Sequence, residues 1–277
     1  MPMDAGIILA LIAMLGFGIS NFLAKKALKA FDLLALVFFR GILLAIIIAP
    51  FSLFLGAAFD AYFILLAAII SLIGFFPIFF LYKALRTGKL GIVMPIANSS
   101  IIYTVLLSAV FFRESLSVLQ YAALALVIAG IITISLKRHK GTLSRGVVPA
   151  FITSILWGLT FFLWKIPVSV LGPLLTSFII EFGIAIWALL AMKGELPKSP
   201  GREKLNLVIM IGIVGAIGSV SYSMSLNLLQ ASLAVPIVFS NVFVSTILAR
   251  VFDREKLRPH QYISSAAIMA GIILLVM

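Results

Sequence analysis

Residues 111–132 have the sequence FFRESLSVLQYAALALVIAGII, and residues 252–273 have the sequence FDREKLRPHQYISSAAIMAGII. The second stretch repeats the first 141 positions later, with the same residues at the Phe, Arg-Glu, Gln-Tyr and Ala-Gly-Ile-Ile positions. The same offset relates Pro95-Ile96 to Pro236-Ile237. The sequence therefore predicts a chain built from two copies of one half.

The composition predicts a membrane protein. Hydrophobic residues make up 63% of the chain and charged residues 11%, too few to cover the apolar surface of a soluble domain. The net charge is +12, and the positive residues lie in short loops between apolar stretches. This distribution is typical of a membrane protein and not of a nucleic-acid-binding protein. There is no cysteine, so disulfides and thiol chemistry are excluded. The first apolar segment lacks a basic start and a cleavage pattern, so we expect it to be a retained span.

Ten apolar segments are long enough to cross the hydrocarbon core, which takes about 20 residues. They cover residues 5–24, 33–55, 61–82, 90–112, 117–136, 147–168, 172–192, 205–228, 233–251 and 260–276. The main break in composition, at Lys137–Gly141, falls between the fifth and sixth spans. We therefore expect two domains, 1–138 and 145–277, each a five-helix repeat. Because five is odd, the second repeat enters the membrane from the opposite face, an inverted arrangement that is typical of secondary transporters.

The distribution of cations predicts an orientation. Nearly all Lys and Arg residues fall on one predicted face of the membrane, whereas the other face has only Arg113 and Lys165. Loops that face the cytoplasm are enriched in Lys and Arg. This asymmetry predicts a multi-pass protein of the cell membrane with both termini outside the cytoplasm.

Several of these stretches resemble a known family. They are Phe111–Leu116 with its copy Asp253–Leu257, the early stretches Gly18–Phe22 and Trp157–Phe162, and an arginine inside the second span. Across nearly its whole length the chain resembles ten-span members of the drug/metabolite transporter superfamily, of the EamA-domain type. The resemblance implies alternating access between two five-helix bundles, a cavity lined mainly by spans one, three, four, six, eight and nine, and peripheral spans five and ten. It also implies cytoplasmic termini, the opposite of the orientation that the charges predict.

Arg40 and Glu181 are the ionisable residues well inside predicted spans, at matching positions of spans two and seven. A lone charge at mid-membrane costs about 2.5–3.5 kcal/mol on insertion scales, so each should find a partner or water. One interpretation is a substrate or coupling site, with Glu181 as the carboxylate that takes up a proton. The other is a structural bridge that holds the bundles together.

Two polar clusters follow prolines that we expect to act as hinges, Pro95 and Pro236, near the starts of spans four and nine. A proline removes a backbone donor, and the freed carbonyl can face a cavity. The predicted substrate-binding residues are Asn98, Ser99 and Tyr103 in the first cluster, Ser240 and Asn241 in the second, and Asn21, Tyr82, Trp157 and Tyr222 elsewhere. The alternative role for the small polar residues is hydrogen bonding between helices.

The charged residues at the span ends have simpler interpretations. Lys25 and its repeat counterpart Lys165 are expected to extend to the membrane surface, although Lys165 could instead attract an anionic group. Arg113-Glu114 and Arg254-Glu255 are expected to cap loops and to form local ion pairs, without a role in substrate binding.

These features favour a secondary-active transporter that exports or exchanges a small amphipathic metabolite such as an amino acid, with a proton or a second solute as the possible coupling partner. An exporter of hydrophobic drug-like compounds is the alternative within transporters. A passive channel and a membrane enzyme are the rivals from other classes, and an enzyme is the weaker because no span carries paired carboxylates or a histidine cluster. No catalytic residue, metal site, cofactor or nucleic-acid partner is predicted. The lipid bilayer is the other expected partner, and the chain is expected to be a monomer or a homodimer.

Overall fold

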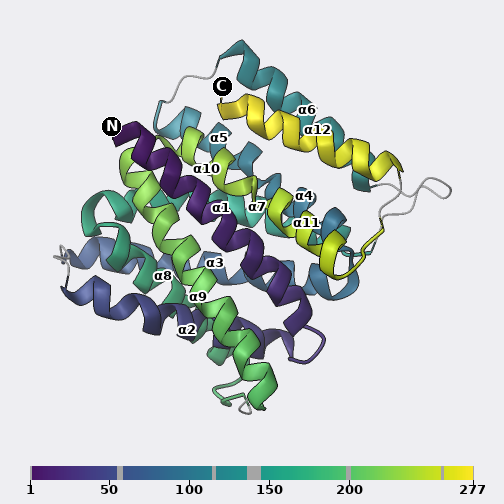
Figure 1. Ribbon diagram of the computed structural model, residues 1–277. Helices are drawn as coiled ribbons and strands as arrows, with labels where there is room; N and C mark the ends of the chain where they lie inside the picture. The colour runs from purple at the N-terminus through teal and green to yellow at the C-terminus, as the bar shows by residue number, and fades with distance from the viewer. Residues whose placement is uncertain are drawn as a thin grey trace.

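The computed structural model describes residues 2–54, 59–113, 117–135, 145–197, 201–256 and 259–276, and these carry helices without any strand. The helices of the first half are α1 (Pro2–Ala27), α2 (Leu33–Phe54), α3 (Ala61–Thr87), α4 (Leu90–Asn98), α5 (Ser100–Phe111) and α6 (Val118–Ser135). Those of the second half are α7 (Val147–Leu171), α8 (Pro173–Ala191), α9 (Arg202–Leu228), α10 (Ala231–Phe239), α11 (Asn241–Phe252) and α12 (Pro259–Val276). Figure 1 shows the helices packed into one bundle, with α6 and α12 side by side at its edge.

The helices match the predicted spans. Within the described residues, eight helical stretches are long and apolar enough to cross a membrane, and α6 and α12 each contain a shorter apolar stretch. The pairs α4–α5 and α10–α11 each count as one of the eight, because a single residue separates the two helices. The expectation of an all-helical membrane protein of ten spans is therefore confirmed.

The fourth and ninth spans are interrupted just after their prolines. Pro95 and Pro236 lie inside α4 and α10 and cannot donate to the preceding turn. The interruptions come at Ser99 and Ser240, whose N–H groups are shared between the proline carbonyl and the next carbonyl at 3.1–3.2 Å. Each span is thus two short helices joined by a tight turn at the same place in its repeat.

The packing of the helices shows a pseudo-two-fold relation between the halves. Helix α1 packs against α9, and its counterpart α7 packs against α3, the counterpart of α9. Likewise, α1 contacts α10 and α11, while α7 contacts α4 and α5. Helices α2 and α8 pack against each other, as do α6 and α12. Such reciprocal contacts are what a two-fold axis produces, and a repeat of five spans makes the two halves inverted.

Small residues allow the close approach of α1 and α9. A Cβ atom added at Gly16 would lie 2.7 Å from the carbonyl oxygen of Val214 and 2.9 Å from Cα of Gly218. The two backbones therefore touch at this point. Inside a membrane the hydrophobic effect does not drive helices together, and close packing at small residues stabilises their contact instead. This packing fixes α1, which carries part of the candidate site, against the second half.

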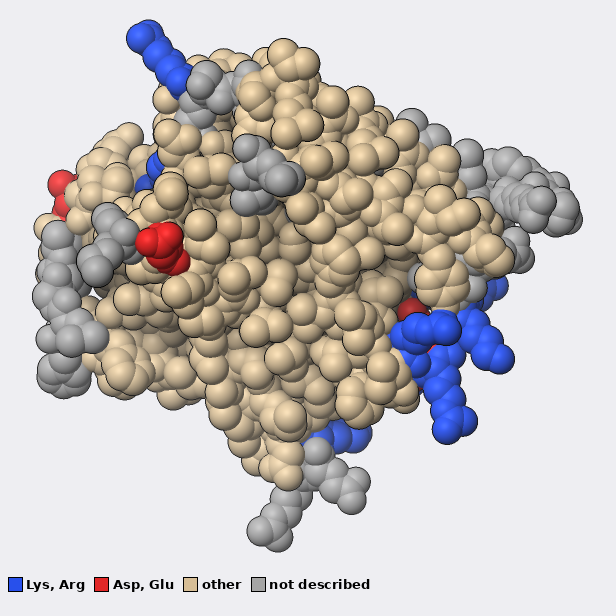
Figure 2. Space-filling model, turned by 45° about the horizontal axis from the view of Figure 1, so that its top comes forward, with Lys and Arg blue, Asp and Glu red and all other residues tan. Residues whose placement is uncertain are grey.

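We call the side of the molecule that bears Lys25, Lys89, Lys204 and Glu255 the charged face. These residues lie near one another in the fold, because Lys25 contacts Glu255, Lys89 donates to the carbonyl of Lys256, and Lys204 approaches the carbonyl of Ala30. Most of the Lys and Arg side chains visible in Figure 2 project from the lower right of the molecule, and the broad middle of the surface is uncharged. That uncharged belt is the surface expected to contact lipid.

Candidate functional site

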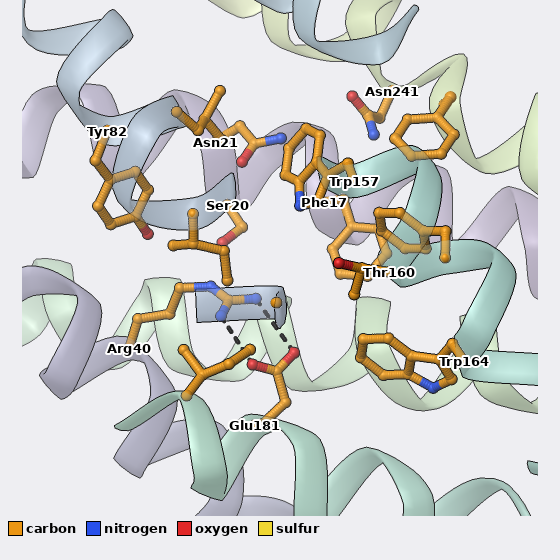
Figure 3. A pocket seen from close by; sticks show the side chains of 16 residues that line it. Phe17, Ser20, Asn21, Arg40, Tyr82, Trp157, Thr160, Trp164, Glu181 and Asn241 are labelled. Atoms are coloured by element: carbon orange, nitrogen blue, oxygen red, sulfur yellow. Dashed lines mark hydrogen bonds and ion pairs between the residues drawn. The ribbon is translucent and has the colours of Figure 1, made fainter. Parts of the chain in front are cut away.

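A small cavity lies between the two halves, where side chains from both of them converge (Figure 3). Its volume is about 50 Å³, room for a few water molecules. The lining residues are Phe17, Ser20, Asn21, Arg40, Gly74, Ile78, Leu81, Tyr82, Trp157, Thr160, Phe161, Trp164, Glu181, Ile184, Phe239 and Asn241. This volume is smaller than that of a drug-sized ligand site, which is about 300–1,000 Å³.

One side of the cavity carries a buried ion pair between the two halves. Arg40 of α2 donates from Nη1 to Oε2 of Glu181 at 2.8 Å and from Nη2 to Oε1 at 3.3 Å, a two-bond contact with α8 (Figure 3). The exposed fraction is 8% for Arg40 and 2% for Glu181. Both residues occupy the same position in their repeats, so the pair joins equivalent points of the two halves. The structure thus shows the bridge that the sequence left as one of two interpretations, and places it in the wall of the cavity.

The other side of the cavity is aromatic. The ring of Phe161 lies parallel to that of Trp164, with centroids 6.1 Å apart, and edge-on to that of Phe239 at 4.8 Å. Trp157 packs on Phe239 at 5.9 Å. Trp164 also donates from Nε1 to the hydroxyl of Ser223 at 2.9 Å, which fixes the orientation of its indole ring. These contacts build a rigid apolar wall across from the ion pair.

Hydrogen bonds hold the two interrupted spans together beside the cavity. The amide of Asn98 donates to the carbonyl of Phe239 at 2.7 Å and to Oδ1 of Asn241 at 2.8 Å. Its partners Phe239 and Asn241 both line the cavity, whereas Asn98 itself does not. Ser99 shares a hydrogen bond of 2.7 Å with Ser154 of α7. The polar residues after the first proline therefore support the cavity wall from behind.

The cavity brings together part of the set of residues that the sequence predicts. The predicted residues in the lining are Asn21, Tyr82, Trp157, Asn241, Arg40 and Glu181. Asn98, Ser99, Tyr103, Tyr222 and Ser240 lie outside the lining. Tyr222 is fully buried behind the aromatic wall, where its hydroxyl donates to the carbonyl of Phe161 at 3.2 Å. Tyr103 packs against α7, because a Cβ atom added at Gly158 would lie 2.4 Å from its Cβ.

The sequence analysis missed most of the apolar lining, although helical spacing contains a signal for it. Trp157, Thr160, Phe161 and Trp164 recur three, four and seven positions apart, so they share one face of α7. On α1, Ser20 and Asn21 lie three and four positions after Phe17, so these three residues also share one face of their helix. Once one member of each set is placed in the cavity, the others are expected to follow.

Two further spans line the cavity, and two of the expected ones do not. Helices α2 and α8 contribute Arg40 and Glu181, whereas the resemblance implies a lining that comes mainly from other spans. Among the residues that the structure describes, helix α9 and the span α4–α5 contribute none to the lining. The physical reason on the α9 side is its contact with α1 and α2. Its Gly212 sits against the side chain of Leu43, so that face is used for helix packing.

A second polar cluster ties three helices together on the charged face. Glu255, just after α11, contacts Nζ of Lys25 at the end of α1. Its carboxylate also accepts from the N–H groups of Leu90 at 3.1 Å and Gly91 at 3.3 Å, the first residues of α4. A carboxylate at a helix start is favoured by the unpaired N–H groups there. We call Lys25, Glu255 and these two N–H groups the latch.

The latch differs from the interpretation drawn from the sequence. Lys25 is expected to extend to the membrane surface, yet it pairs with Glu255, and each side chain is only 14% exposed. The carboxylate of Glu255 accepts hydrogen bonds from residues more than 160 positions away. The preceding Arg254 has a positive φ of 50°, and its repeat counterpart Arg113 has a φ of 55°. The chain therefore turns sharply at the same place in each repeat. Glu114, the counterpart of Glu255, lies outside the described residues.

Comparisons with known proteins give the chain its family. The profile of the EamA-like transporter family matches residues 4–136 and again residues 144–277. An uncharacterized protein of Methanocaldococcus jannaschii is 30% identical over 138 residues, which is 48% of this chain and 98% of that protein. That relative is therefore about as long as one repeat. A solved crystal structure of a protein aligns with a TM-score of 0.73 at 18% identity, covering 98% of this chain and 96% of the other, a likeness in fold.

These matches account for nearly the whole chain, half by half. The resemblance to EamA-type transporters and the expectation of two such repeats are confirmed, and transporters of this kind are not enzymes. Within the described residues no group of three or more His, Asp or Glu side chains is placed to hold a metal ion. The protein belongs to the EamA-like transporter family and is a multi-pass membrane transporter made of two EamA repeats.

Proposed function

We propose that this transporter is a secondary-active carrier that exports or exchanges a small amphipathic metabolite, such as an amino acid. The solute binds in the cavity between the halves, and the halves rock to expose it to one side of the membrane and then to the other. The observation that carries the proposal is the position and chemistry of the cavity. It lies where both halves contribute side chains, with polar groups on one side and an aromatic wall on the other.

The lining favours an amphipathic solute over a phosphorylated one. Arg40 is the cation in the lining, and Glu181 already neutralises it. An organic phosphate is bound by several cationic or N–H donors, which this cavity does not offer. Asn21, Asn241 and Thr160 supply uncharged hydrogen-bonding groups, while the aromatic wall supplies apolar contact. A solute with one polar end and one apolar end matches this distribution.

The latch supports alternating access. It joins α1 of the first half to the end of α11 of the second half, and it must open if the halves separate on the charged face. Because the repeats are inverted, the same residue types, Lys165 and Glu114, recur in the sequence on the other side of the membrane. The asymmetry of Lys and Arg leads us to propose that the charged face is cytoplasmic and that both termini lie outside.

Counterflow in proteoliposomes tests the function. Vesicles loaded with an excess of one unlabelled amino acid should accumulate the labelled form above its outside concentration, and each member of a panel of amino acids is tested in turn. Trp157→Leu, which removes part of the aromatic wall, is expected to reduce the rate at least tenfold. Trp187→Leu is the matched control, because Trp187 lies outside the lining and donates to Ser71 instead. Equal rates for the two variants would place binding elsewhere.

The same assay separates the competing functions. A passive channel equilibrates the label without accumulation, which would contradict the carrier mechanism. Counterflow of hydrophobic cations or neutral drugs, with no amino acid accepted, would favour the export of drug-like compounds. That outcome would keep the carrier mechanism and replace the substrate class.

A further inference from the structure

The pair of Arg40 and Glu181 is unusual as a structural bridge, because it is also part of the cavity surface. Both side chains line the cavity, and the other residues that line it are uncharged. Each side chain is nearly buried, and their two hydrogen bonds are directed at each other. A solute entering the cavity therefore meets a positive and a negative group side by side.

The charges on a solute decide whether this pair can open. A buried charge that loses its partner is strongly destabilised. A solute with one charge can satisfy only one member of the pair, and it leaves the other unpaired in the membrane interior. A neutral solute leaves the pair closed. A solute that carries one positive and one negative group a few bonds apart can satisfy both members, so the pair can separate with no charge left alone.

We propose that Arg40 and Glu181 form a recognition pair for zwitterionic solutes, which exchange partners with it. The carboxylate of the solute takes the place of Glu181 on the guanidinium of Arg40, and its ammonium group takes the place of Arg40 on the carboxylate of Glu181. A guanidinium suits this role because its parallel N–H groups match a carboxylate, and an ammonium group has three donors for the freed glutamate. This inference rests on the proposed carrier function and names the substrate class of the same site.

The opposite wall defines what the rest of the solute is like. Figure 3 shows Trp157, Thr160 and Trp164 gathered across the cavity from the pair. Gly74 places no side chain beside Thr160, since a Cβ atom there would lie 3.3 Å from Cγ2 of Thr160 and 3.6 Å from Cδ1 of Ile184. A zwitterion bound to the pair would direct its side chain at this apolar surface. The preferred solutes are therefore zwitterions with an apolar side chain.

The position of the pair links recognition to movement. Arg40 belongs to the first half and Glu181 to the second, so their contact joins the two halves across the pseudo-two-fold axis. A zwitterion placed between them neutralises each charge while α2 and α8 move apart. Only a solute with both charges can thus accompany the movement without leaving a buried charge behind.

Compounds that share an apolar side chain and differ in their charged groups test the proposal on the unmodified protein. The first set is L-phenylalanine, phenethylamine, 3-phenylpropanoate and 3-phenylpropanamide, which share one ring and are zwitterionic, cationic, anionic and neutral. The second set has the side chain of leucine: L-leucine, 3-methylbutylamine, 4-methylpentanoate and 4-methylpentanamide. Binding is measured by calorimetry on detergent-purified protein, and transport by counterflow. We expect the zwitterion of at least one set to bind at least tenfold more tightly than its three analogues.

A paired variant tests the residues themselves. Arg40→Met together with Glu181→Met removes both charges and leaves neither one unpaired. It should bind the zwitterion at least tenfold more weakly while it binds the neutral amide as before. Arg40→Glu with Glu181→Arg restores one charge of each sign and should recover the preference. Elution as a single species and the temperature of unfolding show whether each variant is folded. If neither variant folds, the two compound sets decide the question alone.

The outcomes separate this inference from the proposed function. Transport of the neutral amides with no preference for the zwitterions would overturn the recognition pair and leave the carrier function standing. Transport of the anions at the same rate as the zwitterions would also overturn it, because a solute with one charge would then be sufficient. If the protein binds and carries none of these compounds, nor any amino acid of the panel, both the inference and the proposed substrate class are wrong.

Discussion

Replacing Glu255 by glutamine should open the charged face. The amide keeps the size of the carboxylate and can still accept a bond from α4, but it loses its charge toward Lys25 and toward the helix start. Hydrogen bonds to a charged group contribute about 1.5–3 kcal/mol and neutral ones about 0.5–1.5 kcal/mol. Because the side chain is 14% exposed, solvent screens little of the difference. The closed state should therefore lose ~1–3 kcal/mol, which shifts the conformational equilibrium about 5–150-fold.

A single introduced cysteine measures this shift, since the chain contains no other. Thr160→Cys places a thiol in the cavity lining, and its reaction with a membrane-impermeant maleimide is followed from either face of oriented proteoliposomes. Glu255→Gln should raise the labelling rate from the charged face by the factor above and lower it from the opposite face. Glu195→Gln is the control, because Glu195 is an exposed residue that lines the same surface hollow as Lys204 on the charged face. Equal labelling in the two variants would refute the role of the latch.

Three further predictions test other parts of the account. Gly74→Val should reduce transport at least tenfold, because its side chain would fill the cavity beside Thr160, whose Cγ2 would lie 3.3 Å from the added Cβ. Thermal unfolding shows whether this variant is folded, and normal transport by the folded variant would show that solutes bind elsewhere. Gly16→Ala should destabilise the protein by ~1–3 kcal/mol, because its methyl group would overlap the α9 backbone. Thermal unfolding in detergent checks this against Gly201→Ala, where nothing lies within 4 Å, and equal melting temperatures would contradict the packing. Asp4→Cys should be labelled from outside intact cells, and labelling only after the membrane is opened would reverse the proposed orientation.

The fold was predictable because the sequence carries the same information twice. A single stretch such as residues 111–132 is weak evidence for a fold, but its copy at residues 252–273 defines the length of the repeat. Hydropathy then gives five spans per repeat, and an odd number of spans requires inversion. The interruptions at Ser99 and Ser240 were harder to place, because the prolines before them mark only the neighbourhood of the bend. Each turn forms at the serine whose N–H group is shared between two carbonyl oxygens.

The polar part of the cavity was more predictable than the apolar part. Arg40 and Glu181 stand out because a charge inside a span is costly. Phe161 and Phe239 do not stand out, since a phenylalanine in a membrane helix is equally at home against lipid, another helix or a solute. Asn98 is the opposite case. It has the chemistry of a ligand-binding residue, but its amide is used to hold Phe239 and Asn241 in place.

The latch could not have been predicted from local sequence. Its members lie at the end of α1, at the start of α4 and after α11, and the Lys25 and Glu255 side chains are 230 positions apart. The repeat shows that each of these places has a counterpart in the other half, but it does not show which of them meet. That follows only from the way in which the inverted halves pack.

The central claim is that the cavity communicates with one face of the membrane at a time. Cysteines at Phe22 and Phe252, whose rings lie 5.9 Å apart beside the latch, can be joined by a short, reducible thiol cross-linker. The account predicts that counterflow stops when the cross-link forms and returns when it is reduced. Undiminished counterflow by the fully cross-linked protein would show that the charged face need not open, and would contradict alternating access.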